Sequence, residues 1–387
     1  MKDIRFNYPH ATGREIEAIQ DAIQRGHLSG NGPYSKKCHA WLEKTIGSHK
    51  ALLTHSCTAA LEMAAILSDV GPGDEVIMPS YTFVSTANAF VLRGATPVFV
   101  DVRPDTLNLD ERLIEAAITP RTKVIAVVHY AGVGCEMDVI MDIARRHKLM
   151  VIEDAAQGIH ASYKGKPLGS IGHLAALSFH ETKNVISGEG GALLVNDSQL
   201  AERAEIIWEK GTNRSQFFRG QVDKYTWVDV GSSFLPSELI AAFLWPQLED
   251  TAKICARRLE IWHDYHSALK SLRDAGRIQG PVIPDGRAHN AHMYYTLASN
   301  AAQARAALDE LKTQGIGAIP HYVPLHSSPA GRRFGRSHGE LKVTDEVWRR
   351  LIRFPLWPDM TREDTAQVSD AVMRALGNSK ADKRSVS

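Results

Sequence analysis

The sequence predicts an α/β protein in which helices cover both faces of a largely parallel β-sheet. Two observations carry this prediction. Between residues 50 and 195, short apolar runs of strand length alternate with segments whose apolar residues have helical spacing. The strand-like runs are apolar at almost every position, as in strands that are buried on both faces. In such a sheet, a ligand binds beyond the carboxyl ends of the strands.

The individual elements follow from the same patterns. A helix is expected over residues 11–25, and the residues rich in Gly, Ser and Asn at 26–35 predict a loop. Strands are expected at residues 50–55, 75–79, 96–102, 122–130, 149–154, 174–179 and 191–195. Helices are expected between them at residues 57–70, 82–94 and 137–148.

The pattern changes after about residue 250. A long amphipathic helix is expected over residues 254–272, a strand over 291–299 and a further helix over 301–316. We therefore predict two domains and a tail. Their bounds are a large domain at 1–250, a smaller α+β domain at 251–378 and a disordered polar tail at 379–387.

Composition excludes several classes of function. The 45 basic and 44 acidic residues nearly balance, so no electrostatic surface for nucleic acid is expected. The four cysteines include no C-x-x-C pair, which argues against a disulfide scaffold and against a bound metal. No apolar run is long enough for a membrane span, and the first residues do not resemble a signal peptide. These features predict a cytoplasmic protein with no membrane partner.

Polar residues follow the predicted strands at the edge where a ligand is expected. Ser56, Cys57 and Thr58 open a helix after the first strand, where free backbone N–H groups attract anions. Taken alone, these residues are more often explained by an ordinary helix cap. Phe83 follows the second strand and offers a ring for stacking, although core packing is the commoner role of such a ring.

The later strand ends carry charged groups. Asp154 ends a fully apolar strand, where burial requires a cationic partner, and Gln157 follows it. Glu153 points to the opposite face, as a solvated or paired charge. Ser178 ends the next strand, and Lys183 lies in the turn behind it, where desolvation could make its amine nucleophilic.

One ligand accounts for the whole set, namely pyridoxal 5′-phosphate. Its phosphate suits the hydroxyls and helix start, its ring suits Phe83, and its ring nitrogen requires a carboxylate such as Asp154. Its aldehyde requires a lysine with a free amine, such as Lys183. Each residue alone is a weak signal, but their order at successive strand ends favours this cofactor.

The motifs "HSCTAALEMA", "VIEDAAQGIHASYKGKPLGSIG" and "SFHETKNVISGEGGAL" resemble those of the DegT-type sugar aminotransferases, which depend on pyridoxal phosphate. The resemblance extends from "FNYPHATGREI" to "RFPLWPDMT" and implies the fold-type-I, aspartate aminotransferase-like architecture. "HETKN" and residues 210–249 resemble the branch that aminates C4 of TDP-4-keto-6-deoxyglucose. That branch makes TDP-4-amino-4,6-dideoxygalactose for surface polysaccharides such as O-antigen, with L-glutamate as donor and 2-oxoglutarate as second product.

The resemblance also implies a role for each residue of the cofactor site. Lys183 would hold the aldehyde and then move a proton, and Asp154 would pair with the ring nitrogen. Gln157 would bind the 3-hydroxyl oxygen, and Phe83 would stack on the ring. The residues that would bind the phosphate are Cys57, Thr58 and Ser178.

Members of the family are homodimers, in which a loop of the second subunit completes the phosphate site. In this chain the loop has serines where many members have asparagine, so we expect Ser232 to make that contact. The residues expected to bind the nucleotide-linked keto sugar are Asn213, Arg214, His321 and Tyr322.

Other functions stay open or are disfavoured to different degrees. Family members that dehydrate sugars at C3 carry histidine in place of the lysine, so Lys183 favours amino transfer. A different keto sugar, such as a 3-keto or a UDP- or GDP-linked one, is disfavoured only by the resemblance of "HETKN" and residues 210–249 to the branch that aminates C4. A non-catalytic regulatory protein is disfavoured by the intact Lys183, Asp154 and Gln157. A Rossmann dehydrogenase is excluded because no glycine-rich motif follows the first strand.

Overall fold

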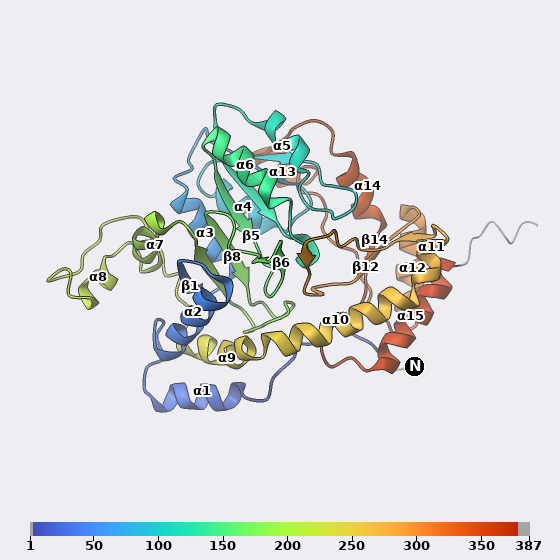
Figure 1. Cartoon of the computed structure of the whole chain (residues 1–387), viewed down its shortest axis with the longest axis horizontal. Coiled ribbons are helices and arrows are strands. Elements are labelled where there is room, and N and C mark those ends of the chain that lie inside the picture. The colour runs from blue at the N-terminus through green and yellow to red at the C-terminus, as the bar shows by residue number, and fades with distance from the viewer. Residues whose placement is uncertain (1–2, 378–387) are drawn as a thin grey trace, which may run out of the picture.

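The computed structural model describes residues 3–377, and an eight-stranded sheet lies at its centre (Figure 1). The strand order is β1-β9-β8-β5-β4-β2-β3-β13, and among these strands only β9 runs antiparallel to its neighbours. The strands are β1 Lys50–Thr54, β2 Glu75–Pro79, β3 Thr96–Val100, β4 Thr122–Val128, β5 Met150–Asp154, β8 Leu174–Ser178, β9 Gly191–Val195 and β13 Arg336–Ser337. The predicted α/β class with a largely parallel sheet is confirmed.

Helices cover both faces of this sheet. Successive apolar side chains of a strand point to opposite faces, and they pack in different hydrophobic cores beneath these helices. In β5, Ile152 packs in the core under α3 and α4, whereas Val151 packs in the core under α5 and α6. The helices around the sheet are α1 Glu15–Gln24, α2 Pro33–Ile46, α3 Cys57–Leu67, α4 Val84–Val91, α5 Glu111–Ala117, α6 Met137–His147, α7 Ala201–Trp208, α8 Arg214–Phe218 and α9 Glu238–Glu249. Short elements between them are η1 Tyr130–Gly132, β6 Ser162–Tyr163, β7 Lys166–Pro167 and η2 Ser198–Leu200.

The loop predicted at residues 26–35 ends earlier than expected, because α2 already begins at Pro33. The carboxylate of Glu238 in α9 accepts hydrogen bonds from the N–H groups of Gly32, Tyr34 and Ser35, at 2.7–3.0 Å. A residue about two hundred positions away therefore satisfies the first turn of this helix.

Most residues after Glu249 form a second packed unit, whereas β13 joins the central sheet and β11 (Arg287–Ala288) pairs with β6. The longest helix of this unit, α10 Thr251–Ala268, runs along the lower side of the molecule in Figure 1. The remaining elements are α11 Lys270–Asp274, β10 Ile278–Gln279, β11 Arg287–Ala288, β12 Tyr295–Ala298, α12 Ala301–Thr313, α13 Pro329–Phe334, α14 Lys342–Arg350, β14 Leu351–Arg353 and α15 Arg362–Gly377. The strand predicted at 291–299 is confined to β12.

The core of this second unit includes Ile4 from the opposite end of the chain, which pairs with Ile316. The domain boundary at residue 250 stays a prediction, and the tail at 379–387 lies outside the described residues. Within residues 3–377, no helix combines the length and the apolar character that crossing a membrane requires.

Candidate active site

Lys183 lies in the turn between β8 and β9, at the carboxyl edge of the sheet. The turn is closed by backbone hydrogen bonds from Phe179 to Gly190 and from Lys183 to His180, both at 2.9 Å. A Cβ atom at Gly191 would lie 2.5 Å from the backbone nitrogen of Cys57. The glycine pair therefore permits the start of β9 to approach the first turn of α3.

The amine of Lys183 is shifted toward its neutral form. Burial lowers the pKa of Lys183, and the charge of Arg353 lowers it further, whereas Cys57 and Asp154 oppose the shift. A neutral amine is the form that attacks an aldehyde and accepts a proton.

Asp154 ends β5 as a buried carboxylate without a cationic partner. Its side chain is 5% exposed and accepts hydrogen bonds from the Thr86 hydroxyl at 2.6 Å and the Ala156 N–H at 3.1 Å. No Lys, Arg or His of residues 3–377 forms an ion pair with it. A buried carboxylate is costly without such a partner, so the position suits a ligand that brings a positive charge.

The neighbouring Glu153 is fully paired within the protein. It accepts hydrogen bonds from His129 at 2.8 Å and from the N–H groups of Gly169, Ile171 and Gly172 at 2.6–2.9 Å. The expectation of a paired charge on the opposite face is therefore confirmed, and nothing remains on Glu153 for a ligand.

Gln157 joins the site to an aromatic wall. Its Oε1 accepts the N–H of Ala131 at 2.7 Å, and its Nε2 donates to the Tyr322 hydroxyl at 3.1 Å. The ring of His321 stacks on Tyr322, and its Nδ1 lies 2.7 Å from the hydroxyl of Tyr130. The structure thus brings the two predicted residues His321 and Tyr322 to the cofactor side of Gln157.

The first turn of α3 lies at one end of the site and has backbone N–H groups without helical acceptors. Ser56 caps the helix by accepting the N–H of Ala59 at 3.1 Å, which is the ordinary role considered for it. The N–H groups of Cys57 and Thr58 belong to the first turn, where no helical carbonyl can accept them. Burial raises the pKa of the Cys57 thiol, so it stays uncharged beside an anion. Ser178 lies buried at the end of β8.

Phe83 lies at the mouth of the site. It immediately precedes α4, its side chain is 56% exposed, and its ring centroid is 6.3 Å from that of Tyr322.

Three predicted residues lie on a segment that projects from the body of the chain, seen around α8 in Figure 1. Asn213 accepts the N–H of Thr226 at 2.7 Å and so closes this segment, and Arg214 pairs with Glu209 at 3.4 Å. Ser232 is exposed. The structure does not bring Asn213 and Arg214 to Lys183 of the same chain, so contacts with a partner's substrate stay predictions.

Sequence reasoning missed several groups that complete the site, among them Thr86, Tyr130 and Arg353. Tyr130 is the last residue of the strand predicted at 122–130, and this position at a strand end could have identified it. Thr86 lies within a helix and Arg353 far along the chain, where no local pattern marks either residue.

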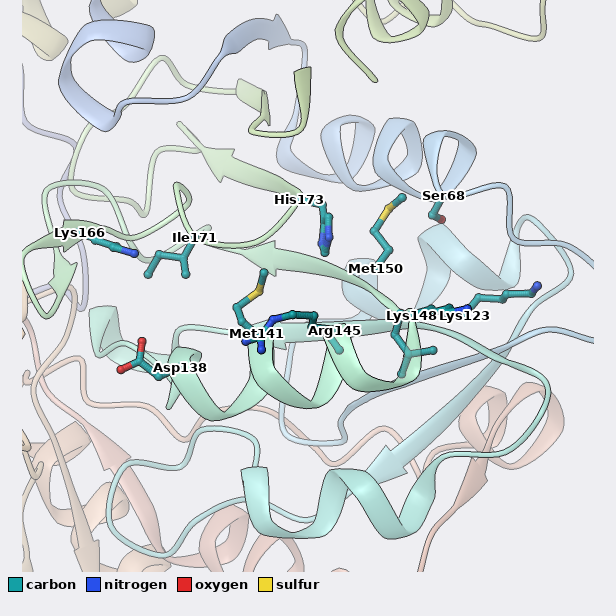
Figure 2. A pocket seen from close by; sticks show the side chains of 12 residues that line it. Ser68, Lys123, Asp138, Met141, Arg145, Lys148, Met150, Lys166, Ile171 and His173 are labelled. Carbon is teal, nitrogen blue, oxygen red and sulfur yellow. The ribbon is translucent and has the colours of Figure 1, made fainter. Parts of the chain in front are cut away.

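The broad hollow in Figure 2 lies at the opposite edge of the sheet, beside α6 and the first residues of β4, β5 and β8. Its lining includes Lys123, Arg145, Lys148, Lys166 and His173. The lysines and Arg145 are exposed, and Arg145 pairs with Asp142 at 3.1 Å. The charged side chains that line this hollow are exposed to solvent. The residues predicted at the carboxyl ends of the strands are not among its lining residues.

The residues at the carboxyl edge fit pyridoxal phosphate as a set. Asp154 provides an unpaired buried carboxylate, Lys183 provides an amine displaced toward neutrality, and α3 provides free N–H groups next to uncharged side chains. Each group matches one part of the cofactor: the ring nitrogen, the aldehyde and the phosphate.

Comparison with known proteins agrees with this fit. Residues 9–373 match the model of the DegT/DnrJ/EryC1/StrS aminotransferase family. The spore coat polysaccharide biosynthesis protein SpsC of Bacillus subtilis is 34% identical over 376 residues, which cover 95% of each chain.

Solved structures are similar throughout their length. DesV of S. venezuelae, in complex with a ketimine intermediate, is 30% identical with a TM-score of 0.88, covering 98% of this chain and 100% of that one. The PLP form of the putative sugar aminotransferase Spr1654 of Streptococcus pneumoniae is 26% identical with a TM-score of 0.89, covering 97% and 99%. The chain belongs to the DegT/DnrJ/EryC1/StrS aminotransferase family and is a sugar aminotransferase of fold type I that uses pyridoxal phosphate.

Proposed function

We propose that this aminotransferase transfers the amino group of L-glutamate to C4 of TDP-4-keto-6-deoxyglucose. The products are TDP-4-amino-4,6-dideoxygalactose and 2-oxoglutarate, and the amino sugar serves surface polysaccharide biosynthesis. The observation that carries the chemistry is the buried Asp154, which forms no ion pair within residues 3–377 and whose charge acts on Lys183. The choice of sugar is supported by "HETKN" and residues 210–249, and the polysaccharide by the name of the Bacillus relative.

Lys183 and Asp154 have different roles in the proposed reaction. When bound, the cofactor supplies an electron sink for the carbon that carries the amino group. Asp154 keeps the ring nitrogen protonated, which sustains that sink. Lys183 removes a proton from the donor carbon and later delivers one to C4 of the sugar, so one amine acts as base and as acid. Its lowered pKa supports both tasks.

The other predicted residues orient the reactants. Gln157 would donate its remaining amide N–H to the 3-hydroxyl oxygen, and Phe83 would stack on the ring. The phosphate would be bound by Cys57, Thr58 and Ser178. Burial lowers the pKa of His321, so the imidazole is neutral and offers hydrogen bonds to an uncharged sugar. Tyr322 lies beside it in the same wall.

A second copy of the chain would complete the site. The projecting segment exposes four aromatic side chains, Phe217, Phe218, Tyr225 and Trp227, which are 38–79% exposed. A monomer seldom exposes such a group without a partner. We propose that this segment docks on the second subunit of a homodimer, where Ser232 contacts the phosphate and Asn213 and Arg214 approach the sugar nucleotide.

The test is the visible absorption of the purified protein loaded with pyridoxal phosphate. L-Glutamate alone should convert the yellow form to the pyridoxamine form, and TDP-4-keto-6-deoxyglucose should then restore it. Mass spectrometry and NMR of the product identify the sugar and the configuration of the new amine at C4. A preference for a 3-keto or a UDP- or GDP-linked sugar would overturn the substrate while leaving the amino transfer intact.

A further inference from the structure

A short segment between β11 and β12, residues 290–292, forms hydrogen bonds with two turns of the candidate active site. We propose that this segment acts as a bracket that sets the position of Lys183 relative to Gln157, with Asn290 and His292 as positioning residues for amino transfer. The proposal rests on the proposed roles of Lys183 and Gln157. It deepens them by naming the residues that hold the two side chains at a fixed separation.

The central sheet does not by itself fix the two turns. β5 and β8 are paired as far as Asp154 and Ala176, and the N–H of Ala155 donates to the carbonyl of Ala176 at 2.9 Å. Gln157 and Lys183 both come after this point in the chain. A displacement of about 1 Å between reacting groups can cost roughly 100-fold in rate, so a restraint beyond the sheet is expected here.

Asn290 connects the two turns directly. Its side chain is fully buried, and its Nδ2 donates to the carbonyls of Gln157 at 2.8 Å and Ile159 at 2.7 Å. Its backbone carbonyl accepts a hydrogen bond at 2.8 Å from Nδ2 of Asn184, the residue next to Lys183. A single residue thus bonds to the turn after β5 and to the lysine turn.

His292 makes a second bond to the lysine turn. Because Nδ2 of Asn184 donates to Asn290, Oδ1 of Asn184 is the acceptor for Nδ1–H of His292, at 3.0 Å. Burial and the charge of Lys183 lower the pKa of His292, so the imidazole stays neutral. Both polar atoms of the Asn184 side chain are therefore held by the bracket.

The backbone of the bracket adopts a conformation that its surroundings must stabilise. Ala291 has a φ of 50°, in the left-handed region, and Arg258 donates to the carbonyls of Ala291 and His292 at 3.1 and 2.8 Å. Gly132 has a φ of 77°, and a Cβ atom there would overlap Oδ1 of Asn290. Such conformations persist where several contacts determine them, and they cluster at functional sites.

The experiment follows the absorbance of the protein loaded with pyridoxal phosphate after saturating L-glutamate is added. Asn290→Ala should slow conversion to the pyridoxamine form roughly 10- to 100-fold, as expected for a displacement of about 1 Å. Glutamate deuterated at Cα should slow this variant more than the unsubstituted enzyme, because a displaced Lys183 makes proton removal limiting. The rate at which pyridoxal phosphate attaches to Lys183 should fall as well.

The matched control is Asn196→Ala at the opposite edge of the sheet, directly after β9. Nδ2 of Asn196 donates to the carbonyls of Gly169 and Gly172 at 2.9 and 2.8 Å, so this variant also loses two hydrogen bonds from an amide to backbone carbonyls. Both alanine variants should lower the thermal stability. Only Asn290→Ala should slow the reaction, and Asn196→Ala should keep its rate within about twofold.

A second pair of variants tests the bracket with a smaller change in structure. Asparagine can donate from Nδ2 close to the position of Nδ1 in histidine, so His292→Asn should retain most of the rate that His292→Ala loses. Equal rates in the two His292 variants would overturn the proposal. So would an unchanged isotope effect in Asn290→Ala, or an equal loss of rate in Asn196→Ala, because either result marks a purely structural role. If L-glutamate leaves the unsubstituted protein unchanged, the proposed donor fails, and the attachment rate of pyridoxal phosphate still decides the role of the bracket.

Discussion

The charged side chains at the two edges of the central sheet differ in their exposure to solvent and in their pairing. At the amino edge, the hollow of Figure 2 collects exposed cations that water can solvate, and Arg145 has a carboxylate partner. At the carboxyl edge, Lys183, Asp154 and Arg353 are withdrawn from water and incompletely paired. The width of a hollow therefore does not identify the functional site in this molecule. The functional edge is identified by buried groups that require a ligand to balance them.

The same contrast occurs within a single strand. Glu153 and Asp154 are consecutive buried carboxylates of β5 on opposite faces. Glu153 is surrounded by four donors from the protein, whereas Asp154 accepts two hydrogen bonds and has no cation. Glu153 therefore stabilises the fold, whereas we propose that Asp154 takes part in the chemistry.

The largest effect should come from Lys183. In Lys183→Ala the group that holds the aldehyde and moves the proton is absent, so turnover should fall by at least roughly 10⁴-fold. Thermal unfolding should change little, since no hydrogen bond of the side chain is lost. Amination of the sugar and the cofactor spectrum are the measurements, and retained turnover would contradict the assigned role.

The paired variants Asp154→Asn and Glu153→Gln sharpen the comparison within β5. We expect Asp154→Asn to lose roughly 10²–10³-fold in turnover, as when one preorganised electrostatic partner is removed, with little change in stability. Glu153→Gln should instead lower the free energy of unfolding by about 3 kcal/mol, because His129 loses its buried partner. Urea unfolding and steady-state rates measure the two effects, and similar behaviour of both variants would break the distinction.

The pH dependence of cofactor attachment reports on Lys183. Only the neutral amine reacts, so the rate should rise with pH and reach its midpoint below the ordinary lysine value of about 10.4. Arg353→Ala removes a charge that lowers this pKa, so the midpoint should move to higher pH. Asp154→Asn removes a charge that raises it, so the midpoint should move to lower pH. Stopped-flow absorbance across pH measures these shifts, and an unmoved midpoint in both variants would contradict the arrangement.

The smallest effect is expected at the amino edge. Lys148 ends α6 with a φ of 56°, in the left-handed region that favours glycine. Lys148→Gly should therefore raise the stability by about 0.5–1 kcal/mol and leave turnover within about twofold. A marked loss of activity would show that the hollow in Figure 2 has a function of its own.

Local patterns predicted the scaffold well. Buried strands are apolar throughout and their helices are periodic, so the strands β1 to β5, β8 and β9 and the helices α3, α4 and α6 follow from the sequence, whereas α5 and the short strands β6 and β7 were not predicted. The carboxyl ends of parallel strands meet at one edge, and this geometry predicts that Cys57, Phe83, Asp154 and Ser178 lie together. The spacing of apolar residues did not predict α2, because the first turn of this helix depends on hydrogen bonds to Glu238 from a distant helix.

The sequence by itself determined the parallel sheet, the lysine turn and the cofactor, because periodicity and strand-end position are local properties of the chain. Only the tertiary structure decided that Asp154 forms no ion pair within residues 3–377 while Glu153 is satisfied, and that the charge of Arg353 in β14 acts on Lys183. It also decided that the segment around α8, on which Arg214 lies, projects from the body of the chain. The physical reason is that pairing and desolvation depend on all neighbours in space. For these residues the deciding neighbours are His129, Phe6 and Thr86, which lie tens or hundreds of positions away along the chain.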